Sequence, residues 1–182
     1  MLLAPAAHAA TVDLTDDSGD VMTATLQQNG DIRYNREHGE EGDIVFARVQ
    51  HTATQLVVYM RYLKLSVPTQ DAGFEYRLEG NNGSHAYIDL ETRHAKPQGT
   101  VSIASERRRC RTAHKVNYAT DSVSVRIPRR CLNKAKYVRV AHVSYRARET
   151  DSSFKVYYDD AMRNGGNLGQ VDNNPTPWVV TD

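Results

Sequence analysis

Short runs of β-branched and aromatic residues, separated by clusters of Gly, Asn, Asp and Pro, recur along the whole chain. Runs of this kind are typical of β-strands, and the clusters between them are typical of turns. We expect strands over residues 11–14, 21–27, 44–52, 55–65, 73–78, 85–90, 100–105, 116–118, 122–127, 137–145 and 154–158. No stretch shows a sustained 3.6-residue apolar period with caps, so helices should be short or absent.

Two stretches carry most of this interpretation. Val123, Val125 and Ile127 alternate with polar residues, and this period of two predicts a strand with one buried face. The run over residues 56–63 is apolar at nearly every position, as a buried helix would also be. Its β-branched and aromatic content, with Pro68 soon after it, favours a central strand.

Turn sequences indicate how the strands are joined. The segment 28–31 (Gln-Asn-Gly-Asp) contains an Asn-Gly pair able to take positive φ, and the segment 80–83 (Gly-Asn-Asn-Gly) joins two strand-like runs, so both favour hairpins. Adjacent strands should therefore be antiparallel. The sequence predicts an all-β fold, an antiparallel β-sandwich of jelly-roll type with one disulfide and little helix. Residues 164–182 read as an irregular tail, anchored by Trp178, Val179 and Val180.

Length and composition are those of one globular domain. The chain has 182 residues, of which 40% are hydrophobic and 25% charged, which excludes a disordered chain. We expect a single domain over residues 10–182, because no segment resembles a long linker. The net charge of +1 gives no reason to expect a nucleic-acid partner, and no run is long enough to cross a bilayer.

The first nine residues resemble the end of a signal peptide. Ala7 and Ala9 flank His8 in the Ala-x-Ala form that signal peptidase recognises, so residues 1–9 are interpreted as a signal-peptide remnant cleaved after Ala9. The basic segment and most of the apolar segment of such a peptide are missing, so on this interpretation the start of the signal lies upstream or was trimmed. The alternative is a disordered Ala-rich terminus. The first interpretation predicts a secreted or envelope-associated protein.

Two cysteines agree with export. Cys110 and Cys131 are expected to form a disulfide, because zinc would require more ligands and the chain has neither C-x-x-C nor H-E-x-x-H spacing. The bridge would close a loop of about 20 residues and contribute roughly 3 kcal/mol. Two free buried thiols are the alternative.

An acidic segment near the start of the chain is a candidate calcium site. Asp16, Asp17 and Asp20 lie between the first two predicted strands, and Asp43 opens a later one. Calcium prefers six to eight oxygen ligands, which a flexible Asp-rich loop can supply. The spacing is not that of an EF-hand. The alternative is a solvated turn whose carboxylates cap backbone N–H groups.

A basic run flanks the cysteines and is a candidate anion-binding patch. Its members are Arg107, Arg108, Arg109, Arg111, Arg129 and Arg130. A disulfide would gather these guanidinium groups, which bind carboxylates and phosphates in bidentate fashion. The alternative is a solvated edge whose charge discourages strand-to-strand aggregation.

Aromatic residues offer a third candidate, a flat row on which a sugar can stack. They are Tyr59, Tyr62, Tyr76, Tyr87, Tyr137, Tyr145, Tyr157, Tyr158 and Trp178. Most lie within predicted strands, where packing is the commoner role. No catalytic residues are predicted, because the chain has no G-x-S-x-G, H-E-x-x-H or P-loop motif and both cysteines are committed.

Several segments together resemble small exported proteins of actinobacteria that have no agreed activity. The segments are 17–20 (Asp-Ser-Gly-Asp), 42–44, 49–52, 125–132 and 137–140. Such proteins are similar in outline to DOMON-like and carbohydrate-binding β-sandwiches, some of which hold a structural calcium. The resemblance to the actinobacterial proteins implies an exported protein and a fold, but no function. The further similarity to DOMON-like and carbohydrate-binding β-sandwiches is an analogy of fold only.

These observations lead to one expectation and two alternatives. We expect a non-catalytic, exported binding or accessory module of the cell envelope, whose ligand is a glycan or an anionic wall polymer. The first alternative is a protein-interaction or structural module, marked by a contiguous exposed apolar patch. The second is a secreted hydrolase, marked by convergent carboxylates with perturbed pKa values or by a histidine bonded to Ser or Asp.

Overall fold

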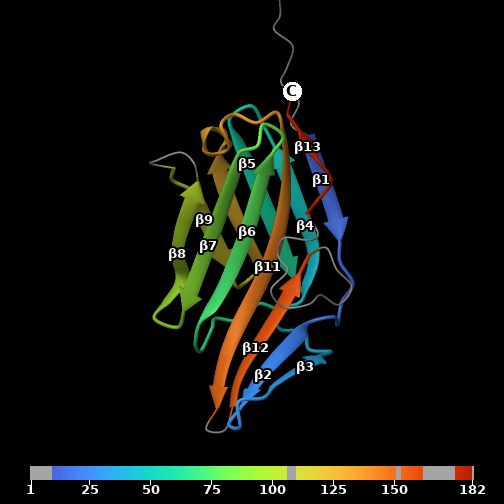
Figure 1. Ribbon diagram of the computed structural model, residues 1–182, viewed down its shortest axis with the longest axis vertical. Helices are drawn as coiled ribbons and strands as arrows, with labels where there is room; N and C mark the ends of the chain where they lie inside the picture. Colours follow the sequence, from blue (N-terminus) through green and yellow to red (C-terminus); the bar gives the residue numbers. More distant parts are fainter. Residues whose placement is uncertain (1–9, 106–109, 151–152, 162–174, 182) are drawn as a thin grey trace, which may run out of the picture.

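A computed structural model describes residues 10–105, 110–150, 153–161 and 175–181 of the chain. Within them the protein is all-β and consists of two sheets in which every strand pair is antiparallel (Figure 1). The first sheet contains, in spatial order, β1 (Ala10–Thr15), β4 (Ile44–His51), β5 (Gln55–Tyr62), β10 (Ser122–Pro128) and β9 (Ala113–Asn117).

The second sheet is wider. In spatial order it contains β3 (Ile32–Arg36), β2 (Met22–Gln27), β12 (Ser153–Asp160), β11 (Tyr137–Thr150), β6 (Ala72–Gly80), β7 (His85–Arg93) and β8 (Lys96–Ser105). The two-residue strand β13 (Val179–Val180) also pairs with β11. Figure 1 shows β2, β3 and the adjoining part of β12 extending past the ends of β4 and β5 at the lower end of the molecule.

One hydrophobic core lies between the two sheets. Leu56, Val58 and Met60 of β5 are at most 1% exposed, as are Tyr76 and Leu78 of β6 in the other sheet, and all five belong to one packed cluster. The buried positions of both strands alternate along the chain, which is the pleat of a half-buried strand. This arrangement confirms the predicted antiparallel sandwich, whereas the jelly-roll type stays a prediction.

The predicted strands are all present, many of them extended by a few residues. The run over residues 56–63 supplies β5, a central strand as predicted, although only one of its faces is buried. Both predicted hairpins form, with Gly30 at φ +86° between β2 and β3 and Gly83 at φ +78° between β6 and β7. The helical part of the described residues is one short 3-10 turn, η1 (Arg129–Leu132).

Two strands were not predicted. β3 has the sequence Ile-Arg-Tyr-Asn-Arg and is exposed at every position, so no buried face marks it in the sequence. β13 is too short to carry a pattern. It does anchor the C-terminal segment as expected, through Val179, which is 1% exposed, while Trp178 lies at the surface.

The predicted disulfide is present. Cys110 and Cys131 are bonded, with their Cα atoms 5.6 Å apart, and Cys131 belongs to the core cluster. The bridge attaches the segment before β9 to the short turn η1 that follows β10. None of the described helices is long and apolar enough to cross a membrane.

Candidate metal centre

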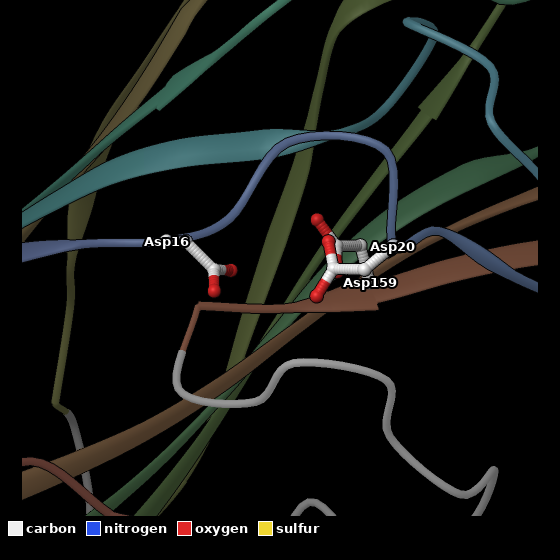
Figure 2. A group of neighbouring side chains, drawn as sticks. All are labelled: Asp16, Asp20 and Asp159. Atoms are coloured by element: carbon white, nitrogen blue, oxygen red, sulfur yellow. The ribbon is translucent and has the colours of Figure 1, made fainter.

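Three carboxylates from distant parts of the chain converge where the chain crosses from the first sheet to the second. Asp16 and Asp20 lie in the loop that carries the chain from β1 in the first sheet to β2 in the second. Asp159 lies near the end of β12. Each residue offers one ligand oxygen, and the three oxygens lie within 4.8 Å of one another. Figure 2 shows the carboxylate of Asp16 turned toward those of Asp20 and Asp159, which lie next to each other.

Backbone hydrogen bonds hold the elements around this group in place. The Ile44 N–H, at the start of β4, donates to Asp159 Oδ2 at 2.6 Å. The Gly19 N–H donates to Asp43 Oδ2 at 2.7 Å, and Gly19 has a φ of +80°, in a region that favours glycine. The Asp17 N–H donates to Asp16 Oδ1 at 3.1 Å. Hydrogen bonds from backbone N–H groups to carboxylates therefore hold the β1–β2 loop against the start of β4, and the start of β4 against the end of β12.

Three of these four acidic groups are buried, and Asp16 is half-buried. Asp20, Asp43 and Asp159 are 1%, 0% and 4% exposed. Burial, reinforced by the charge of Asp20, raises the pKa of Asp16 to about 8. Burial also raises the pKa of Asp159 to about 9, with further contributions from the charges of Asp16, Asp20 and Asp43. The pKa of Asp43 is raised in the same direction, by burial and then by Asp20.

The group has unused capacity to bind a cation. Within the described residues, Asp43 Oδ1 and Asp16 Oδ2 are buried and accept no hydrogen bond. Calcium binds carboxylate oxygens at about 2.3–2.6 Å, so two oxygens on one ion lie at most about 5 Å apart. The separations among Asp16, Asp20 and Asp159 fall within this limit. Hard oxygen donors of this type suit Ca²⁺ better than zinc.

The sequence had identified part of this group. Of the residues predicted for calcium, Asp16 and Asp20 are brought together, and Asp43 is close enough for its charge to raise the pKa of Asp159. Asp17 is exposed, and its carboxylate is outside the set of three. Asp159 was missed, because only the pairing of β12 with β2 brings it to the loop, and a local pattern does not reveal that pairing.

The predicted arginine patch is only partly visible. Arg107, Arg108 and Arg109 lie outside the described residues. The Arg129 guanidinium donates to the backbone carbonyls of Ala135, Ala53 and Lys134 at 3.1–3.4 Å, so it is engaged in holding the turn after β10.

The other two described members of the patch, Arg111 and Arg130, are exposed and lie next to the bonded cysteines in sequence. Anion binding at this patch stays a prediction.

The aromatic residues do not share one surface. Tyr62, Tyr76 and Tyr158 are buried, as expected for packing, whereas Tyr87 and Trp178 are 51% and 42% exposed. The two exposed rings each lie beside a guanidinium group: Arg77 is 5.7 Å from the Tyr87 ring and Arg139 is 4.9 Å from the Trp178 ring.

The features expected of a hydrolase are present only in part. The raised pKa values of Asp16 and Asp159 meet one criterion. Within the described residues, no histidine is seen bonded to a Ser or Asp side chain, so the histidine criterion is not met. The buried His142 donates from Nδ1 to the Glu75 carbonyl at 2.9 Å and accepts at Nε2 from the Tyr62 hydroxyl at 3.3 Å. Its ring stacks on Tyr76 in the core, with 4.4 Å between centroids.

Comparison with known proteins identifies no relative. No family model matches the chain, and neither a curated protein nor a solved structure matches it.

Proposed function

We propose that this protein is a non-catalytic, exported β-sandwich module of the cell envelope that binds Ca²⁺ through Asp16, Asp20 and Asp159. The observation that carries the calcium site is the convergence of three oxygen ligands within 4.8 Å from a loop and from a strand more than a hundred residues away. Only Asp20 of the three lies in a segment on which the resemblance to exported actinobacterial proteins rests, residues 17–20, so the convergence in space is independent support.

Electrostatics favours a bound cation. A buried carboxylate that is neither protonated nor paired is costly, and the charged groups that act on Asp159 are other carboxylates. A divalent cation would neutralise them together and would also offset the nearby charge of Asp43, whose Oδ1 is buried and accepts no hydrogen bond from the described residues. Calcium would thus fasten the β1–β2 loop to the ends of β4 and β12.

Export is supported by two features. The Ala-x-Ala segment at residues 7–9 suits signal peptidase, and a disulfide such as Cys110–Cys131 persists in oxidising compartments. Sites of modest affinity are occupied outside cells, where calcium modules work at 10⁻⁴–10⁻³ M. The ligand we propose for the module is a glycan or an anionic wall polymer.

The calcium site is tested by thermal unfolding of the chain in chelator and in millimolar CaCl₂. We expect calcium to raise the unfolding midpoint of the wild type, and Mg²⁺ to raise it less because magnesium demands a tighter octahedral site. Asp159→Asn should abolish the calcium response. Glu40→Gln, which neutralises an exposed carboxylate outside the cluster, should keep it. A wild-type midpoint that does not move with calcium would refute the site.

A second candidate function, protein interaction, is favoured by an exposed apolar row. Phe154 of β12, Leu26 of β2 and Ile32 of β3 are direct cross-strand partners and therefore point to the same face. They are 42%, 44% and 54% exposed. Sedimentation equilibrium tests this candidate. Self-association that Leu26→Ser weakens would support it, and a monomer at all concentrations would exclude self-association through this row.

A further inference from the structure

A hollow of about 370 Å³ lies beside the acidic cluster, between β11, β12 and the segments that lead into β2 and β4. This volume is in the range of small-ligand pockets. The polar and aromatic side chains that line it are those of Glu37, Glu41, Thr69, Arg146, Arg148 and Tyr157.

Strand register explains why the hollow and the acidic cluster are neighbours. Along β12, Tyr157 and Asp159 are two residues apart and so point to the same face of the sheet. Their partners on β11 are Arg146 and Ser144, which share that face. Tyr157 and Arg146 line the hollow, while Asp159 belongs to the cluster.

Most charges in the hollow are already paired. Glu41 binds the Arg146 guanidinium and also accepts from the Ser66 N–H and hydroxyl, both at 2.7 Å. Glu37 binds the Lys155 ammonium, which lies 4.8 Å from the centre of the Tyr157 ring. These pairs hold the walls of the hollow in position without contributing net charge.

Arg148 differs from the other charged groups of the hollow. Its side chain is exposed, and no ion pair or hydrogen bond to another described residue is found for it. A guanidinium group of this kind presents a planar fork that matches a carboxylate. The hollow therefore carries one unneutralised positive charge next to an aromatic ring and a hydroxyl.

We propose that this hollow binds a uronic acid residue of an acidic glycan. The sugar carboxylate would pair with the Arg148 guanidinium, the sugar ring would pack on Tyr157, and a sugar hydroxyl would bond to Thr69 or Glu37. This inference rests on the proposed binding function and names its ligand class and its site. It does not depend on calcium being bound.

The chemistry distinguishes this ligand from its neutral analogue. A neutral hexose has the same ring and hydroxyls but nothing to pair with Arg148. D-glucuronate and D-glucose differ only at C6, so they form a matched pair of probes. Charge-assisted bidentate bonds are about twice as strong as neutral ones, and their loss commonly weakens binding about tenfold or more.

The experiment is a titration of the ¹⁵N-labelled full chain with D-glucuronate and with D-glucose, followed by chemical-shift changes. We expect glucuronate to shift resonances of residues around Arg148 and Tyr157, and glucose to bind at least tenfold more weakly. Arg148→Ser should weaken glucuronate binding at least tenfold. Arg126→Ser, which removes an exposed guanidinium on β10 of the other sheet, is the matched control and should leave it unchanged.

Substitution of the ring provides a second measurement. Tyr157→Ala should weaken glucuronate binding, and Tyr157→Phe should restore most of it, because packing against the sugar needs the ring and not the hydroxyl. Equal binding of glucose and glucuronate would overturn the assignment to a uronic acid.

Two outcomes separate the hollow from the proposed function. If glucuronate oligosaccharides bind but Arg148→Ser has no effect while Arg130→Ser does, the ligand sits at the arginine patch and the hollow is refuted. If neither acidic glycans nor anionic wall polymers bind in an array, the proposed binding function fails, and the hollow as a part of it fails too.

Discussion

Asp159 Oδ2 accepts a hydrogen bond from the Ile44 N–H at 2.6 Å, which joins the end of β12 in one sheet to the start of β4 in the other. The bond is buried and spans 115 residues of sequence. It fixes the carboxylate of Asp159 and thereby the position it presents to Asp16 and Asp20. The packing of the two sheets therefore positions the cluster, and a cation that binds there finds the carboxylate oxygens already in place.

Asp159→Asn is expected to have opposite effects with and without calcium. In chelator at pH 7 the variant should be more stable than the wild type by about 1 kcal/mol or more, because the buried Asp159 carboxyl, whose pKa is raised to about 9, must take up a proton on folding and the amide need not. An asparagine Oδ1 can still accept from the Ile44 N–H. With calcium the order should reverse, because the variant lacks a charged ligand. Urea unfolding in both buffers measures this, and an equal loss of stability in both would contradict it.

His142 predicts how stability depends on pH. Burial lowers the pKa of His142 to about 3, against about 6.5 in the unfolded chain. Between these values the unfolded chain binds one more proton than the folded one. The contribution of His142 is therefore complete above pH 6.5 and declines as the pH falls toward 3, by up to about 1.4 kcal/mol per pH unit.

His142→Gln should remove this dependence, because the amide does not titrate in this range and can still donate to the Glu75 carbonyl. Urea unfolding of both proteins from pH 7 to pH 4 gives the test. Acidic groups such as Asp159 titrate in both proteins, so the difference between the two curves isolates His142. Parallel curves would show that the folded protein accepts the proton on His142 without cost.

The strands were predictable because their signals are local. Alternation in Val123, Val125 and Ile127 records the pleat directly, and Gly30 and Gly83 mark turns that need positive φ. β3 lacks such a signal, since a strand exposed on both faces has no constraint to alternate. The order of the strands in each sheet could not be predicted in this way, because the sequence of a strand does not identify the strand with which it pairs.

The same distinction applies to the candidate site. Asp16 and Asp20 were predicted from one loop, whose density of carboxylates is visible in the sequence. Asp159 depends on the pairing of β12 with β2, and the hollow depends on the register of Arg146 with Tyr157 across β11 and β12. Both are long-range relations. A sequence pattern could have located the acidic loop, but not the third ligand or the neighbouring hollow.

Gly73 and Tyr145 provide a test of packing on the outer face of the second sheet. The two residues are cross-strand partners on β6 and β11, and a Cβ added to Gly73 would overlap the Tyr145 ring. Gly73→Ala should therefore destabilise the protein by about 1–3 kcal/mol, the usual range for overpacking. In a Tyr145→Ala background the same change should cost little. A double-mutant cycle measured by urea unfolding checks this, and additive effects would contradict it.

The disulfide should stabilise the chain mainly through the unfolded state. Cys110 and Cys131 are 21 residues apart, and the segment between them includes β9 and β10, so cutting the bridge frees a loop that carries two strands of the first sheet. For a loop of this length the chain-entropy estimate is about 3 kcal/mol, and we expect Cys110→Ala with Cys131→Ala to lose about 2–4 kcal/mol in urea unfolding. Reduction of the wild type, verified by mass spectrometry, should produce a similar loss and controls for the altered side chain at the buried position 131. If full reduction leaves the urea midpoint unchanged, the bridge contributes nothing to stability, and the closure of this loop must already be provided by the pairing of β9 with β10 and of β10 with β5.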